Sequence, residues 1–221
     1  MNDGYLFLIG CWILIVLVAS QWLDFIWKKG SPIPRKRMIL LLFLFLLLAS
    51  QPFYLSVTPK LSIHIGMYVI AGGMFLYYFY KDPLAFRLQI VAVILFLAVF
   101  YAVAYEMFLL DPILMLVPPV LLIPAFMSVF VVLTTTNIKH QWLMLTGGFL
   151  LGELGHKTFL LRYVDYVHLG DAIFRDQYIV ALFLTTMLYG LILICLKGIR
   201  MAFRSVVRVG KGLKPRHSDG Q

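Results

Sequence analysis

Residues 88–110 read LQIVAVILFLAVFYAVAYEMFLL, an apolar run whose single charged side chain is Glu106. A helix of this length crosses a hydrocarbon core of about 30 Å, because about 20 residues suffice at about 1.5 Å per residue. The rest of the chain has the same character, since 62% of the 221 residues are hydrophobic and only 13% are charged. Soluble domains average about 45 to 50% apolar and about 25% charged residues. The composition therefore excludes an ordinary soluble domain and indicates a protein whose solvent is lipid.

Six further apolar runs predict an all-α fold, a polytopic transmembrane helical bundle with seven spans. The predicted spans are residues 5–27, 38–57, 61–80, 88–110, 113–134, 142–161 and 178–196. The sixth is the most polar of them, and a re-entrant segment is the alternative interpretation there. We expect residues 1–196 to form the bundle and residues 197–221 to form a basic cytoplasmic tail.

The distribution of basic residues predicts the orientation, because cytoplasmic segments retain Lys and Arg. With the N-terminus outside and the C-terminus inside, most of the 19 Lys and Arg residues fall on the inner side, above all in the first loop and the tail. A six-span arrangement would place those two basic segments on opposite sides. We therefore expect a multi-pass protein of the cell membrane.

Ionisable side chains inside a membrane are costly and mark functional candidates. In the predicted topology the polar residues within the spans share the outer half of the bundle. They are Glu153, His156, Lys157, Glu106, His64 and Gln51. Glu153, His156 and Lys157 lie on one helix face at spacings of three and four. This cluster is either a proton-titratable or ligand-binding site, or a set of structural groups that neutralise one another.

The fifth span contains Pro118, Pro119 and Pro124. Each proline removes an amide donor and frees a carbonyl one turn earlier, so we expect a kinked or broken helix. Freed carbonyls form substrate sites in transporters, whereas a kink needed only for packing is the alternative that we favour. Gly148 and Gly152 form a GxxxG pair, which predicts close contact of the sixth span with a neighbouring helix.

Catalytic motifs are absent from the sequence, which has no HExxH, GxSxG, CxxC or phosphate-binding loop. Glu153 and His156 make one Glu-x-x-His spacing, but a di-metal carboxylate bundle needs two such pairs and two more carboxylates. A membrane metalloenzyme that uses His64, Glu153 and His156 is a minor alternative. We expect no enzyme and assign no catalytic, cofactor or metal residue.

Two further segments are amphipathic. Residues 162–177 mix charged, aromatic and aliphatic side chains, which suits a segment on the outer surface that either caps the polar half of the bundle or simply connects two spans. The tail places its basic residues at helical spacings, and these are Lys197, Arg200, Arg204, Arg208 and Lys211. We expect this face to contact anionic lipid headgroups, with a cytoplasmic protein partner as the alternative. Nucleic acid is not an expected partner.

The stretch GGFLLGELGHKTF at residues 147–159, with the chain size, the Leu- and Phe-rich spans, the short outer N-terminus and the basic tail, resembles the YphA-like membrane proteins of spore-forming Gram-positive bacteria. The resemblance implies a plasma-membrane location and carries over no functional residue. From the residues themselves we expect a non-enzymatic protein with an interaction or assembly role. The alternative is a small-solute or proton-coupled carrier that uses Glu153, His156, Glu106 and the break at Pro118 and Pro119.

Overall fold

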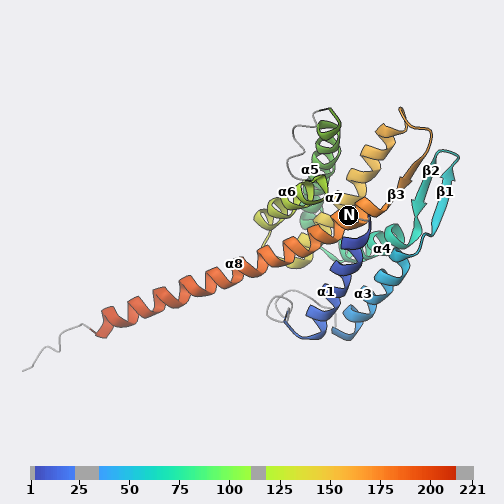
Figure 1. Ribbon diagram of the computed structural model, residues 1–221. Helices are drawn as coiled ribbons and strands as arrows, with labels where there is room; N and C mark the ends of the chain where they lie inside the picture. Colours follow the sequence, from blue (N-terminus) through green and yellow to red (C-terminus); the bar gives the residue numbers. More distant parts are fainter. Residues whose placement is uncertain (1–2, 23–34, 111–117, 213–221) are drawn as a thin grey trace, which may run out of the picture.

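The computed structural model describes residues 3–22, 35–110 and 118–212, and these are mostly helical (Figure 1). The helices are α1 (Tyr5–Ala19), α3 (Arg35–Ser50), α4 (Ile65–Lys81), α5 (Leu84–Leu110), α6 (Pro119–Thr134), α7 (Ile138–Leu160) and α8 (Ala172–Gly212). The strands are β1 (Tyr54–Thr58), β2 (Leu61–His64) and β3 (Val167–Leu169). The predicted helical character is confirmed, whereas the strands were not expected.

Two of the described helices are long and apolar enough to cross a membrane, through Leu84–Phe108 in α5 and Ala172–Ile199 in α8. Helices α1 and α6 are apolar but shorter. Helix α7 runs without interruption through the polar sixth segment, from Ile138 to Leu160. An unbroken helix is the shape expected of a spanning segment rather than a re-entrant one. The count of seven spans and the orientation stay predictions.

A three-stranded sheet occupies residues that we expected at the ends of the second and third spans. Strands β1 and β2 form an antiparallel hairpin in which Tyr54 lies opposite His64. Strand β3 lies parallel to β2, with Val167 opposite Leu61. The expectation of helix at residues 54–57 and 61–64 is wrong, because a short apolar run has the same hydropathy as strand or as helix. In Figure 1 the hairpin lies on the side of the molecule opposite the projecting end of α8.

Helix α7 packs closely on α5 along a row of small residues. A Cβ atom added at Gly148 would lie 2.7 Å from the Cβ of Leu97, and one added at Gly152 would lie 2.7 Å from the Cβ of Tyr101. Only glycine lets two helix backbones approach this far. The close contact predicted from the GxxxG pair is confirmed. It also turns the face that carries Glu153 into the bundle.

Helix α8 first packs on the bundle and then leaves it. Phe174, Ile179 and Ala181 are buried against the other helices. From Leu191 onward most of the described side chains are exposed, and Figure 1 shows the far end of α8 extending well beyond the other helices. A helix of 41 residues is about 60 Å long, which is about twice the hydrocarbon thickness. A single crossing of the hydrocarbon layer therefore uses only part of α8.

Helices α3 and α4 touch backbone to backbone at Gly66. A Cβ atom there would lie only 2.0 Å from the carbonyl oxygen of Leu48, whereas one at Gly73 in the same helix would meet nothing within 4 Å. A backbone carbonyl cannot rotate away as a side chain can. The glycine at position 66 is therefore required by the approach of the two helices.

We expect Gly66→Ala to lower the free energy of unfolding by about 2 kcal/mol or more, because the two helices must separate. Gly73→Ala is the matched control and should be neutral or stabilising by up to about 1 kcal/mol, since alanine favours a helix. Thermal unfolding in detergent, followed by loss of the monodisperse gel-filtration peak, measures both. Equal midpoints for the two variants would contradict the close contact.

The outer polar cluster as a candidate functional site

Glu153 is the most deeply buried carboxylate of the described residues and is fully inaccessible to solvent. It projects from α7 toward α4 and the loop before α8. The Tyr68 hydroxyl donates to its Oε2 at 2.6 Å, and the backbone N–H of Gly170 donates to its Oε1 at 2.8 Å. Both carboxylate oxygens therefore have a donor. Glu153 joins α7 to α4 and to the segment after β3.

The neighbours of Glu153 on the same helix face are also paired. Lys157 Nζ lies 2.6 Å from Asp171 Oδ2, which makes a partly buried ion pair. His156 Nδ1 lies 3.0 Å from Glu106 Oε1 on α5, and the imidazole stacks on the Tyr105 ring at 4.6 Å. The two predicted residues His156 and Glu106 are thus brought together. Their contact joins α7 to α5.

His64 and Gln51 form a separate contact beside the sheet. The N–H of Met67 donates to His64 Nδ1 at 3.2 Å, so the proton of the neutral ring lies on Nε2. Nε2 in turn donates to the backbone carbonyl of Gln51 at 2.7 Å. The Gln51 side chain is exposed and does not enter the cluster.

The centre of the polar contacts is the segment from residue 170 to residue 177, which we call the 170–177 hub. Its Asp176 carboxylate accepts from the N–H groups of Gly4 at 2.9 Å and Phe7 at 2.6 Å, at the first turn of α1. Its Arg175 guanidinium donates to the carbonyl of Ala49, at the last turn of α3. A negative group therefore sits at a helix N-terminus and a positive group at a helix C-terminus, as the helix dipoles favour.

Gln177 links the hub to two more helices. It is fully buried, and its Oε1 accepts from the Tyr101 hydroxyl at 3.0 Å while its Nε2 donates to the Tyr105 hydroxyl at 2.5 Å. The same Nε2 lies 3.3 Å from the carbonyl of Pro119 at the start of α6. Buried amides need such partners, because an unpaired one costs about 1 to 3 kcal/mol. The Pro119 carbonyl is thus bonded inside the protein.

The prolines of the predicted fifth span have different positions in the helix. Pro118 is the N-cap of α6 and Pro119 is its first residue, a position where the missing N–H costs nothing. Pro124 lies inside α6. The part of this span before Pro118, residues 113–117, lies outside the described residues. The structure therefore places a helix start at the two prolines that we assigned to a break.

Sequence analysis found Glu153, His156, Lys157 and Glu106, and the structure places all four at the outer polar cluster. It missed the hub residues Asp176 and Gln177 and the Tyr68 partner of Glu153. One signal was available, since Asp171 directly precedes α8 and accepts from the N–H of Phe174 at 2.9 Å, as an N-cap does. The expectation that residues 162–177 lie on the surface is wrong for the hub, because Phe174 is buried.

Among residues 3–22, 35–110 and 118–212, no three His, Cys, Asp or Glu side chains gather as a metal site would require. His64, Glu153 and His156 instead have the protein partners described above. The five basic tail residues belong to the part of α8 that leaves the bundle.

We expect Glu153→Leu to lower the free energy of unfolding by about 2 to 4 kcal/mol, because it leaves the buried Tyr68 hydroxyl and Gly170 N–H without an acceptor. Glu153→Gln keeps one acceptor and should cost less. Glu106→Gln is the control, since its side chain is 31% exposed and the cost should stay below about 1 kcal/mol. Thermal unfolding in detergent measures the series, and a Glu153→Leu protein as stable as the unmodified chain would contradict the structural role.

Comparison with known proteins gives one match. The family model described as YphA-like integral membrane protein matches residues 3–208, which is nearly the whole chain. Searches of curated proteins and of solved structures found no match. The resemblance seen in the sequence is therefore confirmed.

Proposed function

The chain belongs to the YphA-like integral membrane protein family, and we propose that it is a non-enzymatic, multi-pass protein of the cell membrane with an interaction or assembly role. We propose further that its N-terminus is outside and its C-terminus inside. The proposed interaction role rests mainly on the projecting end of α8. The polar cluster supports the same role, because its groups are used inside the protein.

The projecting end of α8 combines an apolar stem with a basic face. The apolar window ends at Ile199, and the helix continues to Gly212. At about 100° per residue, the positions of the five basic tail residues fall within about 80° of one another around the helix. Ile199 and Val206 fall on the opposite side. Such a helix is built to lie on an anionic surface, and lipid headgroups of the inner leaflet are the surface that we propose.

The outer polar cluster argues against the carrier alternative. A carrier site needs groups that can exchange a protein partner for a solute, yet both oxygens of Glu153 and the hub residues Asp176 and Gln177 bond to backbone or side-chain donors from other elements. A half-satisfied buried network is costly, so such groups are held in place. We infer that the cluster stabilises the fold and does not bind a solute.

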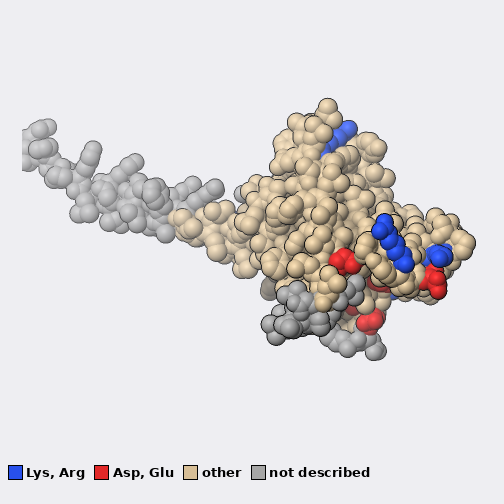
Figure 2. All heavy atoms as spheres, turned by 90° about the horizontal axis from the view of Figure 1, so that it is seen from above, with Lys and Arg blue, Asp and Glu red and all other residues tan. Residues whose placement is uncertain are grey.

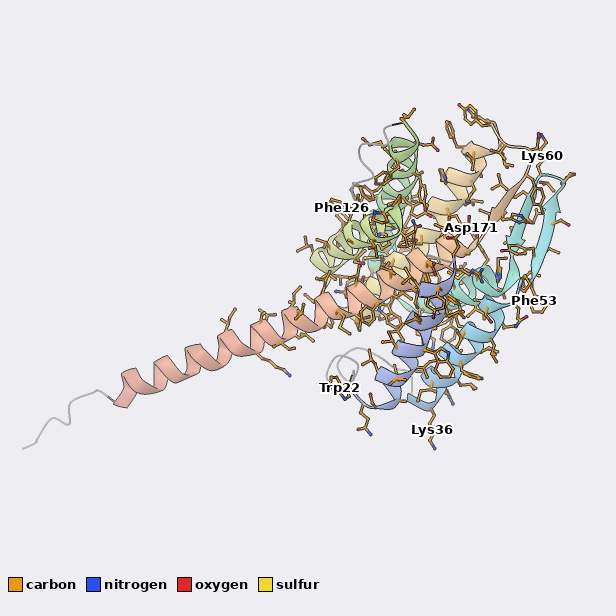
Figure 3. The ribbon with its side chains drawn as sticks, viewed as in Figure 1. Trp22, Lys36, Phe53, Lys60, Phe126 and Asp171 are labelled. Atoms are coloured by element: carbon orange, nitrogen blue, oxygen red, sulfur yellow. The ribbon has the colours of Figure 1, made fainter. Side chains whose placement is uncertain are left out.

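The proposed orientation is supported by the positions of labelled side chains. Figure 3 shows Lys36 and Trp22 near one end of the molecule and Lys60 at the other, at the tip of the β1–β2 hairpin. Figure 2 shows the molecule from above relative to Figure 1, and most of that face is uncharged, with its Lys, Arg, Asp and Glu side chains mostly on one part of it. Lys36 belongs to the predicted inner side and Lys60 to the outer.

We expect a cysteine at position 60 to react with a membrane-impermeant maleimide in intact cells and a cysteine at position 36 to react only after permeabilisation. Both variants start from a chain in which Cys11 and Cys195, which form no disulfide, are replaced by alanine. Both positions are exposed, so the difference in labelling reports the side of the membrane. Labelling of position 36 in intact cells would overturn the orientation.

The interaction role is tested by photo-crosslinking in cells from position 203, beside the basic face. Replacing the five basic tail residues with glutamine should abolish the crosslinked product, because the helix loses its attraction to an anionic surface. The control keeps all five charges but distributes them around the helix. Mass spectrometry of the product distinguishes phospholipid from protein.

The same experiment on Glu153→Gln distinguishes the carrier alternative. We expect the crosslink to remain, because the cluster is far from the tail along α8. Solute or proton flux in proteoliposomes that is lost in Glu153→Gln, with the tail crosslink unaffected by charge removal, would favour the carrier and overturn the proposal.

A further inference from the structure

A cavity of about 100 Å³ lies at the end of the bundle opposite the polar cluster, between α3, α4, α7 and α8. Its walls are almost entirely apolar and include Met38, Phe45 and Ala71. On α7 its lining extends from Lys139 to Thr146, which spans about 10 Å along the helix. We call this cavity the inner slot. Its length along α7 and its apolar walls suit a segment of an acyl chain.

The mouth of the inner slot is basic. Lys139 lines it, and Arg37 directly precedes the lining residue Met38 and has an exposed side chain. Lys36 is exposed at the same end, on the face of α3 that turns away from the lining residues. Lys81 is one turn beyond the lining residue Tyr78 on α4 and is exposed as well. Aromatic and basic residues together are typical of the level of the lipid headgroups.

Positive charge at this mouth exceeds negative charge among the described residues. Asp82 is bound by Lys139 at 2.6 Å and lies 3.4 Å from His140. Arg87 donates to the backbone carbonyls of Asp82 and Tyr80, so its charge is not neutralised by those contacts. The four remaining cations of this end therefore face a single carboxylate that Lys139 already neutralises.

We propose that the inner slot binds a segment of one acyl chain of an anionic phospholipid, whose phosphate is held at the mouth by Arg37 and Lys81. The apolar walls contact the acyl chain, and the excess positive charge favours an anionic headgroup. Basic pockets between spanning helices on the cytoplasmic side are known to hold anionic headgroups. This site is separate from the tail of α8 and does not rest on the interaction role proposed above.

Trp142 reports on the slot because it lines the cavity. Trp12 and Trp22 are exposed, and they and Trp27 can be replaced by phenylalanine to leave Trp142 as the single indole. A bromine atom on an acyl chain quenches tryptophan fluorescence on contact. The protein is reconstituted at increasing mole fractions of brominated phosphatidylglycerol or of brominated phosphatidylcholine.

We expect half-maximal quenching of Trp142 at a mole fraction at least about fivefold lower for brominated phosphatidylglycerol than for brominated phosphatidylcholine. Arg37→Gln with Lys81→Gln should reduce this preference to within about twofold. Both side chains are exposed, so this double variant should fold as the parent does. Equal quenching by the two lipids in the parent would show ordinary boundary lipid and overturn the proposal.

Filling the slot tests where the chain lies. Ala71→Leu adds bulk to the cavity wall and should reduce the quenching by phosphatidylglycerol by at least half. Ala92→Leu makes the same change on an exposed face of α5 and should leave the quenching unchanged. Quenching that survives in a monodisperse Ala71→Leu protein places the lipid elsewhere and overturns the proposal. If Ala71→Leu does not fold, the double charge variant alone decides.

Discussion

Helix ends are the main constraint on this fold. In lipid no water satisfies the N–H groups of a first turn or the carbonyls of a last turn, so each end needs a partner from the protein. The 170–177 hub supplies such partners at the outer end of the bundle. Asp176 caps α1, Arg175 caps α3, and Gln177 binds the first carbonyl of α6. The arrangement of the helices around α8 follows from these bonds.

Charge at the outer end therefore stabilises the fold. Asp176 and Arg175 are adjacent in sequence and opposite in charge, and each complements the dipole of the helix end that it caps. Glu153 accepts from the N–H of Gly170 at the start of the hub, and Lys157 pairs with Asp171 next to it. Buried polar groups are stable only when all are bonded. This requirement explains why these polar residues gather around the hub.

Sequence analysis identified those residues of the network that are polar within an otherwise apolar run. A carboxylate such as Glu153 stands out in an apolar run, and the glycine pair before it indicates close helix packing. Gln177 gave no such signal, because its partner Tyr101 is 76 residues away and glutamine is common near span ends. Strand β1 was missed for a different reason: all five of its residues are exposed, so no alternation of burial separates it from helix.

The two ends of the bundle have different chemistry, and α8 joins them. At the proposed outer end the polar groups bind one another, while at the proposed inner end the described cations exceed the carboxylates and Lys139 lines an apolar slot. Tyr178, Ile179 and Leu182 line that slot and directly follow the hub on α8. An acyl chain in the slot would therefore contact the same rigid helix that holds the hub and projects the basic tail. Inner-leaflet lipid at the slot and at the tail would act on one structural element, which gives lipid composition a direct physical route to the position of α8.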